Sequence, residues 1–173
     1  MQLKAAGLDM VYMGIESGDP QVLKDVKKGV TREEMIEAGR KLKRCGIFCS
    51  ATLISGLGGR QRLREHAIAS ASLISAIKPD YVGFLTLMID PQASVYSKIV
   101  SGELELLNPE DVVEEMKLFL QNVDSEGTVF RSNHASNYVI LKGTLNEDIP
   151  SMLAYLRQVE EQGKYREERW RRF

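Results

Sequence analysis

The stretch Ile47-Phe48-Cys49-Ser50-Ala51-Thr52-Leu53-Ile54-Ser55-Gly56-Leu57-Gly58-Gly59 decides the fold class of this chain. Its first part, up to Ser55, is a mostly apolar run, and a glycine-rich segment ends that run. A short apolar run that turn residues close is typical of a buried strand in a parallel sheet. The stretch therefore predicts a strand over 47–55, followed by a tight turn.

Two similar runs flank this strand. Asp9–Ile15 lies upstream and Tyr81–Ile89 lies downstream. Helical patterns separate the runs: a capping box begins at Thr31, and Gln61–Ile77 is rich in alanine. Strands that alternate with helices indicate βα units and a parallel sheet. The sequence predicts further elements as follows: helices over Gln21–Lys28, from Asn108 and from about Asn146, and a short strand over Thr128–Arg131.

The three βα units predict an α/β fold, a partial (half) TIM-type barrel of parallel βα units with a C-terminal helical extension. A complete barrel has about 250 residues, whereas this chain has 173. We expect residues 1–127 to form the partial barrel and residues 128–173 to form a mainly helical extension with a basic tail. Gln2–Ala6 has the pattern of a last helical turn that Gly7 ends, so we expect upstream parts of a larger fold to be missing.

The composition restricts the class of protein. The formal net charge of −1 gives no overall attraction to nucleic acid or to an anionic membrane. Two cysteines, Cys45 and Cys49, cannot form a disulfide framework. We expect both to be buried thiols in a reduced, cytoplasmic protein. No apolar run reaches the length of about 18 residues that a membrane span needs.

Several segments resemble one family when they are taken in series. They are Gly14-Ile15-Glu16-Ser17-Gly18, then Leu23 with Lys28-Gly29, then 51–59, and finally Asn133-His134-Ala135-Ser136-Asn137-Tyr138. Together they resemble the second half of the radical S-adenosylmethionine (radical SAM) barrel. The most similar branch is that of the iron–sulfur oxidoreductases, which is related to oxygen-independent coproporphyrinogen oxidases and tRNA-methylthiolating enzymes. The resemblance covers about Leu3–Leu145.

The resemblance implies S-adenosylmethionine as the cofactor. In an intact relative a reduced [4Fe-4S] cluster cleaves S-adenosylmethionine, and the 5′-deoxyadenosyl radical then abstracts hydrogen from the substrate. The family's Cys-x3-Cys-x2-Cys motif, which holds the cluster, is absent from this chain. We therefore expect no metal ligand here and a chain that is inactive alone. The expected partner is the missing N-terminal barrel half, or a second copy bound through the open sheet edge at strand 9–15.

The resemblance also implies roles for single residues. Glu16 contacts the polar methionine or ribose part of S-adenosylmethionine, and Lys28 lies near its carboxylate. The glycine segment and Ile54 line the adenine and methionine side. The alternatives are a solvated acid, a surface lysine and a plain strand-to-helix turn. Ser50 and Thr52 point the same way along their strand. The full set of candidate cofactor-binding residues is Glu16, Lys28, Ser50, Thr52, Ile54, Gly56, Gly58, Leu85, Thr86 and Leu87.

Two other readings remain open for the function of the whole chain. One is a non-catalytic interaction or scaffold domain that retains the fold, and the other is an RNA-binding accessory domain. The second depends on the tail, where Tyr165, Trp170 and Phe173 alternate with arginines. A salt-bridged terminal helix, in which Glu167 and Glu168 face the arginines, is the favoured account of the tail.

The two histidines receive different interpretations. His134 lies among polar residues and, with Asn137, is either a substrate contact or part of a structural hydrogen-bonded corner. The structural corner is favoured, because no carboxylate or cysteine stands beside it at ligand spacing. His66 lies on an alanine-rich helix and is expected to be exposed to solvent.

Overall fold

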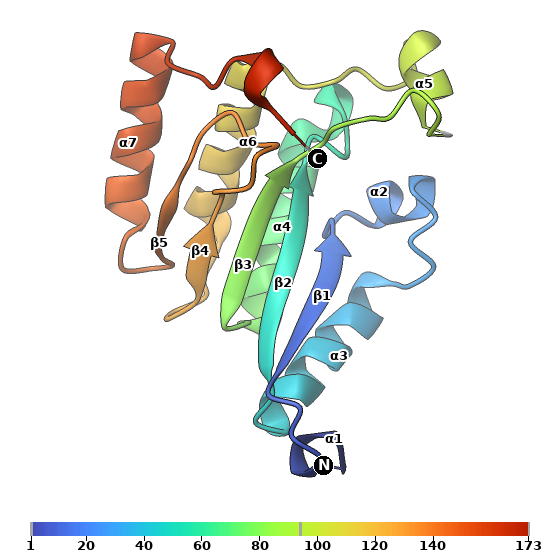
Figure 1. The fold of residues 1–173 in the computed structure, drawn as a ribbon, viewed down its shortest axis with the longest axis vertical. Coiled ribbons are helices and arrows are strands. Elements are labelled where there is room, and N and C mark those ends of the chain that lie inside the picture. The colour runs from blue at the N-terminus through green and yellow to red at the C-terminus, as the bar shows by residue number, and fades with distance from the viewer. Residues whose placement is uncertain (1, 94, 173) are drawn as a thin grey trace.

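The computed structural model describes residues 2–93 and 95–172, and it contains a single five-stranded sheet (Figure 1). Phe173, one of the tail aromatic residues considered above, lies outside the described residues. The strands follow one another in the order β1 (Met10–Glu16), β2 (Phe48–Ser55), β3 (Tyr81–Thr86), β4 (Val129–Arg131) and β5 (Lys142–Thr144). The first four strands are parallel, and β5 is antiparallel to β4. The helices are α1 (Gln2–Ala5), α2 (Pro20–Asp25), α3 (Arg32–Arg44), α4 (Leu63–Ile77), α5 (Tyr96–Val100), α6 (Pro109–Asn122) and α7 (Ile149–Gln162).

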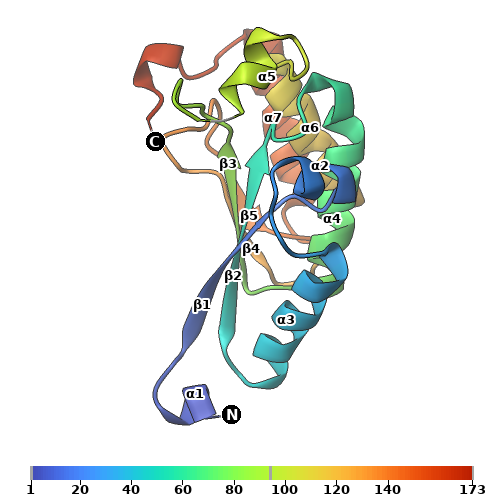
Figure 2. The ribbon, with the colours of Figure 1, turned by 90° about the vertical axis from the view of Figure 1, so that its right-hand side faces the viewer.

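The helices α3, α4 and α6 cover one face of the sheet, and the opposite face is open along β1, β2 and β3 (Figure 2). Burial along β2 alternates accordingly. Ala51, Leu53 and Ser55 are buried on the helix side, whereas Ser50, Thr52 and Ile54 are half-buried on the open side. This arrangement confirms that the chain has an α/β fold of parallel βα units, a partial TIM-type barrel.

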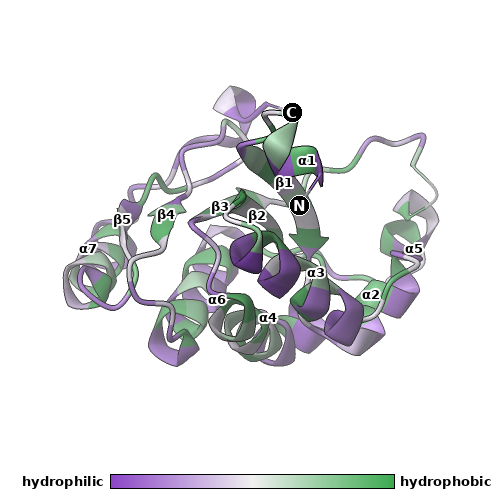
Figure 3. Cartoon of the chain, turned by 90° about the horizontal axis from the view of Figure 1, so that it is seen from below, coloured by the Kyte–Doolittle hydropathy of each residue, from purple (hydrophilic) through white to green (hydrophobic). Residues whose placement is uncertain are grey.

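Sequence signals at the helix ends act as expected. The Thr31 hydroxyl accepts a hydrogen bond from the backbone N–H of Glu34, and the Glu34 carboxylate accepts one from the backbone N–H of Thr31. Asn108 and Asp111 form a second capping box at the start of α6. Each box satisfies amides that a helix cannot pair internally. The outer surface of α3 is hydrophilic (Figure 3), and only Met35 and Gly39 of this helix are buried.

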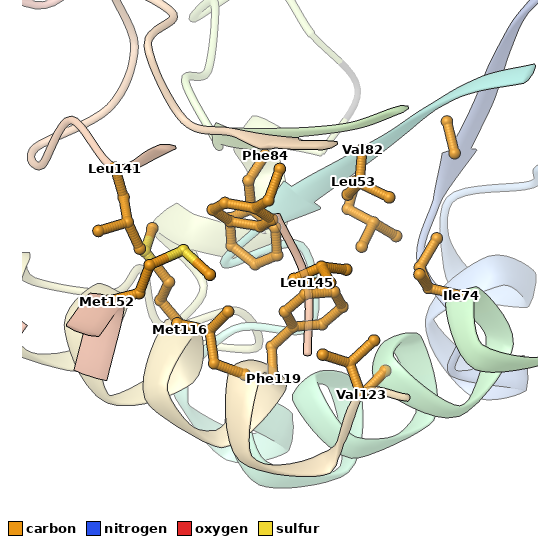
Figure 4. Close-up of a cluster of buried hydrophobic side chains, with 14 of the residues drawn as sticks. Leu53, Ile74, Val82, Phe84, Met116, Phe119, Val123, Leu141, Leu145 and Met152 are labelled. Carbon is orange, nitrogen blue, oxygen red and sulfur yellow. The ribbon is translucent and has the colours of Figure 1, made fainter. Parts of the chain in front are cut away.

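The core lies between the sheet and its helix layer (Figure 4). Three phenylalanines form its centre: Phe84 of β3, Phe119 of α6 and Phe130 of β4. Their ring centroids lie 5.3 to 6.0 Å apart in tilted arrangements, which aromatic pairs prefer. One continuous cluster of buried side chains runs from Ile15 to Val159, so the same core supports the strands and α7. The division at residue 127 into two domains stays a prediction.

Some boundaries differ from the predicted ones. The strand predicted over Tyr81–Ile89 ends at Thr86, because the N–H of Leu87 makes the last bond to β2, at the carbonyl of Ser55. The helix predicted to reach Lys28 ends earlier, and Lys27 adopts a left-handed φ of 53°. Strand β5 was not predicted, because it has no apolar run and depends on pairing with β4.

Strand β1 forms one edge of the sheet. Within the described ranges it pairs with β2 alone, as the sequence predicted for strand 9–15. The C-terminal part of the chain joins the opposite edge, where α7 packs beside β5 and α6 (Figure 1). It therefore does not cover the β1 edge. Among the residues that the structure describes, no helix has the length and apolar character that a membrane crossing needs.

Candidate cofactor site at the carboxyl ends of the strands

Glu16, the last residue of β1, has an unusual backbone conformation. Its φ is 65°, and the register between β1 and β2 shifts between Gly14 and Glu16. A left-handed φ costs a residue with a side chain about 1–3 kcal/mol and often marks a functional position. The Glu16 carboxylate turns back over Gly14 and leaves no room there for a β-carbon. Gly14 pairs with Thr52 of β2, so the carboxylate lies near this part of the open sheet face.

Lys28 forms an ion pair with Glu16. Its Nζ atom lies 3.3 Å from Oε1 of Glu16, and each side chain is 24% exposed. The backbone N–H of Lys28 donates to the carbonyl of Leu23, which ties the lysine to the end of α2. The neighbouring Lys27 is exposed. Of the two adjacent lysines, the structure therefore brings Lys28 to Glu16.

The glycine segment after β2 makes the predicted tight turn. Gly56 has a φ of 82°, which favours glycine, and its carbonyl accepts a hydrogen bond of 2.9 Å from the N–H of Gly59. Gly58 is buried against Val22 and His66. A short 3₁₀ helix over Arg60–Arg62 then leads into α4.

A cavity of about 210 Å³ lies between this turn and the end of β3. Gly56, Thr86 and Leu87, all predicted site residues, line it together with the side chains of Tyr138 and Arg171. Leu85 is not in this cavity. It pairs with Ile54 in register, and both side chains are half-buried on the open face. Most of the predicted residues therefore divide into a cavity group and an open-face group. Gly58 belongs to neither group, and Ser50 pairs with Tyr81 at the start of β3, away from the carboxyl edge.

His134 and Asn137 form a hydrogen-bonded corner beside this cavity. Asn137 is 1% exposed; its Nδ2 donates to the carbonyl of Phe84 over 2.7 Å, and its Oδ1 accepts from the Thr86 hydroxyl. His134 is exposed, and its Nδ1 lies 2.9 Å from the hydroxyl of Ser136. These contacts support the structural alternative for both residues.

The tail folds onto the same corner. Arg171 is 6% exposed, and its guanidinium donates to the carbonyls of Ser136 and Leu87 and lies 4.0 Å from the centre of the Tyr138 ring. It also pairs with Glu168 at 2.8 Å. Burial raises the pKa of Tyr138 to about 12, with a further contribution from its hydrogen bond to Glu168. The ion pairs expected in the tail are therefore present, but they form around a single 3₁₀ turn, Glu168–Trp170, rather than a helix.

His66 was predicted to be exposed, and this prediction is wrong. His66 is 1% exposed, and its Nδ1 lies 2.7 Å from Oε1 of Glu115, which is fully buried on α6. The reason is helix geometry: His66 lies on the same face of α4 as Ser70 and Ile77, and that face is buried. Spacing along α4 could have shown this, whereas nothing in the sequence pairs His66 with a residue 49 positions away.

The two cysteines lie far from the carboxyl edge. Cys45 is half-buried at the end of α3, and Cys49 is buried near the start of β2, on its helix side. Burial raises the pKa of the Cys49 thiol, and the nearby Asp80 raises it further. Within residues 2–93 and 95–172, no group of three or more His, Cys, Asp or Glu side chains is arranged to hold a metal ion.

Comparisons with known proteins agree with this arrangement. Residues 1–68 match the family model of the Radical SAM superfamily. Over 104 residues the chain is 27% identical to an uncharacterized methyltransferase of Pyrococcus horikoshii, an alignment that covers 60% of this chain and 22% of that protein. Over 52 residues it is 38% identical to a Methanocaldococcus jannaschii protein provisionally named as a methylthiotransferase; this alignment covers 30% of the chain and 12% of that protein. The matches thus span less than a quarter of either curated relative.

A solved structure extends the match in fold to almost the whole chain. Elp3 of the archaeon Methanocaldococcus infernus, with an N-terminal deletion (1-46), superposes with a TM-score of 0.65 at 21% identity. The match covers 94% of this chain and 38% of Elp3. The family model over residues 1–68, the similar relatives and the shared fold together support a radical SAM superfamily member that carries part of the barrel.

Proposed function

We propose that this chain supplies the ribose, methionine and adenine contacts of the S-adenosylmethionine site in a radical SAM Fe–S oxidoreductase. The observation that carries the proposal is the left-handed Glu16 at the carboxyl end of β1. In barrel folds this edge of the sheet is where ligands bind. Backbone strain persists only when the surrounding structure or a function maintains it. Here the strained backbone holds a half-buried carboxylate on the open face of the sheet.

The ion pair of Glu16 and Lys28 matches the charges of an α-amino acid. The methionine part of S-adenosylmethionine carries an ammonium and a carboxylate on one carbon atom. A carboxylate and an ammonium 3.3 Å apart can exchange partners with such a zwitterion. We therefore assign the cofactor's ammonium, or a ribose hydroxyl, to Glu16 and its carboxylate to Lys28.

The remaining contacts are assigned to the two neighbouring strands. Gly56 lines the cavity beside this edge, and its N–H and carbonyl are held by Glu115 and Gly59. The backbone of 85–87 lies beside that turn and is assigned to the adenine side. Its Leu87 N–H already bonds to Ser55, and its Leu87 carbonyl already accepts from Arg171. Ile54 adds an apolar contact, and the hydroxyls of Ser50 and Thr52 lie on the open face. When bound, S-adenosylmethionine supplies the 5′-deoxyadenosyl group, and the assigned residues bind and orient it.

A [4Fe-4S] cluster does not fit the residues of this chain. Such clusters are held by several thiolates, and the chain has two cysteines, at the other end of β2. These thiols therefore have no part in the proposed chemistry. The chain alone is expected to be inactive, and the cluster ligands are expected from an N-terminal barrel half. The two relatives are named as a methyltransferase and a methylthiotransferase. We therefore propose transfer of a methyl or methylthio group as the reaction class of the intact enzyme.

One observation favours a second candidate, an interaction domain that retains the fold. The open face exposes Tyr12 (79%), Phe48 (50%) and Tyr81 (39%), and β1 has a free edge. Apolar surface and unpaired strand groups of this kind bind other chains. The occupant would be the N-terminal barrel half or a second copy. An RNA-binding role is less favoured, because Arg166 and Arg171 donate to main-chain oxygens of the 134–138 corner.

Calorimetric titration with S-adenosylmethionine tests the proposal. We expect weak binding to the isolated chain and at least tenfold weaker binding to Glu16→Gln, since the loss of one charged hydrogen bond of about 1.5 kcal/mol or more has this effect. Gly14→Ala is a sharper probe: it leaves Glu16 in the chain and displaces its carboxylate. We expect this variant to bind as weakly as Glu16→Gln.

Glu33→Gln is the matched control, because Glu33 is an exposed acid on the outer helix α3. Free methionine should compete with S-adenosylmethionine if the pair of Glu16 and Lys28 binds the amino acid end. Equal affinity of the wild type and both site variants would remove Glu16 from the site.

Sedimentation tests the second candidate, the interaction domain. A stable dimer or a complex with an N-terminal barrel half is expected if the open face and edge bind a partner.

A further inference from the structure

We propose that Glu115 and His66 are positioning residues that fix the Ser55–Gly56 turn in its ligand-facing shape. The inference rests on the proposed function and deepens it, because this turn is one wall of the assigned cofactor site. Neither residue was expected to have a role from the sequence. Neither one lines the cavity.

Both carboxylate oxygens of Glu115 have hydrogen-bond partners, and one of them contacts the turn. Oε2 accepts hydrogen bonds from the Ser55 hydroxyl, at 2.5 Å, and from the backbone N–H of Gly56, at 2.9 Å. Oε1 lies 2.7 Å from Nδ1 of His66 on α4. The carboxylate therefore links the end of β2 to α4 and α6. It contacts the turn at its first glycine, where the chain takes a φ of 82°.

His66 completes this support from α4. Its side chain is 2% exposed, and its Nε2 is buried without a hydrogen-bond partner among the described residues. With Glu115 ionised, Nδ1 is the donor to Oε1, because an ionised carboxylate only accepts. His66 Cβ also lies against Gly58, on the far side of the same turn. The histidine thus orients the carboxylate and packs against the glycine segment.

A purely structural role and a positioning role differ in which side chains could replace Glu115. A fully buried carboxylate is costly unless its hydrogen bonds repay the loss of solvation. An apolar side chain of similar size could fill the space in the core, but it could not bond the Gly56 amide. A charged acceptor makes stronger and shorter hydrogen bonds than a neutral one. In metal sites, residues that hold the ligating side chains change affinity about 10- to 100-fold without touching the metal, and we expect an effect of similar size here.

Amide hydrogen exchange of the ligand-free chain tests the inference first. In Glu115→Leu we expect exchange at Gly56 and Leu57 to rise roughly tenfold or more, while the amides in the middle of α6 change much less. Glu115→Gln retains one acceptor oxygen for the turn, so it should restore most of the protection. Glu114→Gln is the matched control, since the neighbouring Glu114 is half exposed on the same helix and pairs with Lys117.

Titration with S-adenosylmethionine is the second measurement. Affinity should fall about tenfold or more in Glu115→Leu and less than about threefold in Glu115→Gln. If Glu115→Leu does not fold, Ser55→Ala removes one of the bonds to Glu115 and should raise exchange at Gly56 more than at any core amide. Exchange that rises equally across α4 and α6, with no excess at the turn, would overturn the positioning role.

The two measurements separate this inference from the proposed function. If the wild type binds no S-adenosylmethionine while the exchange pattern is as expected, the cofactor assignment fails and the role of Glu115 at the turn stands. If the wild type binds and Glu115→Leu binds equally well, the positioning role fails and the cofactor assignment stands.

Discussion

Replacing Arg171 with methionine tests how the tail is held. Methionine retains much of the apolar part of the side chain and removes the guanidinium. The guanidinium donates to two main-chain carbonyls, those of Ser136 at 2.7 Å and Leu87 at 3.1 Å, and stacks on Tyr138. Hydrogen bonds to a charged group contribute about 1.5–3 kcal/mol each. Even at the lower end of this range, the two carbonyl bonds place the loss for the docked tail at about 3 kcal/mol, which is a factor of roughly 100 in the docking equilibrium.

Hydrogen exchange with mass spectrometry should detect this loss in the peptide 164–172. The tail can detach without unfolding the core, because the buried cluster runs from Ile15 to Val159 and includes no residue of the tail beyond a contact with Tyr165. We therefore expect exchange of the tail to rise by about two orders of magnitude, with a much smaller change in the thermal midpoint.

The control for this experiment is Arg169→Met. Arg169 is also a tail arginine, but its side chain is 70% exposed and pairs with Glu167 on the surface. Surface pairs of this kind contribute little to stability, so exchange of the tail should change by less than a few fold. Equal protection of the tail in the Arg171 variant and the wild type would refute the reasoning.

Two further predictions concern the core and the phenol beside the tail. Phe119→Ala should lower the free energy of unfolding by about 3–5 kcal/mol in a urea titration, since Phe119 is fully buried between Phe84 and Phe130; a loss below about 1 kcal/mol would contradict this packing. Tyr138 should lose its proton near pH 12, against 10 in an unfolded chain, so stability is expected to fall as pH rises from 10 through 12. Ultraviolet titration of wild type and Tyr138→Phe checks this, and an identical late phase in both would exclude Tyr138 as its source.

The order of strands and helices could be predicted from the sequence because its signals are local. Apolar runs closed by turn residues located β1, β2 and β3 to within a few residues. The capping box at Thr31 and the cap residue Asn108 located the starts of α3 and α6. Strand β5 could not be found in this way. Its three residues, Lys142–Thr144, have no strand pattern, and only their pairing with β4 makes them a strand.

The candidate site was predictable in part for the same reason. Glu16 and the glycine turn lie at strand ends, which the sequence marks, and parallel strands bring their ends together. The pairing of Glu16 with Lys28 also spans only 12 positions. Glu115 was missed because its partners Ser55 and His66 are 60 and 49 positions away. The hydrogen-bond partners of buried polar side chains on helices depend on packing that a single sequence does not display.

The hydrogen bonds of Asn137 predict which positions vary together among relatives of this chain. Its amide donates to the main-chain carbonyl of Phe84, an acceptor that every residue provides, and its oxygen accepts from the hydroxyl of Thr86, which few residues provide. In an alignment of homologues, positions 86 and 137 should therefore vary together, whereas position 84 should vary independently of 137. Joint conservation of 86 and 137 beside the cavity would suggest ligand contacts, but the attachment of the 134–138 corner to β3 already accounts for it.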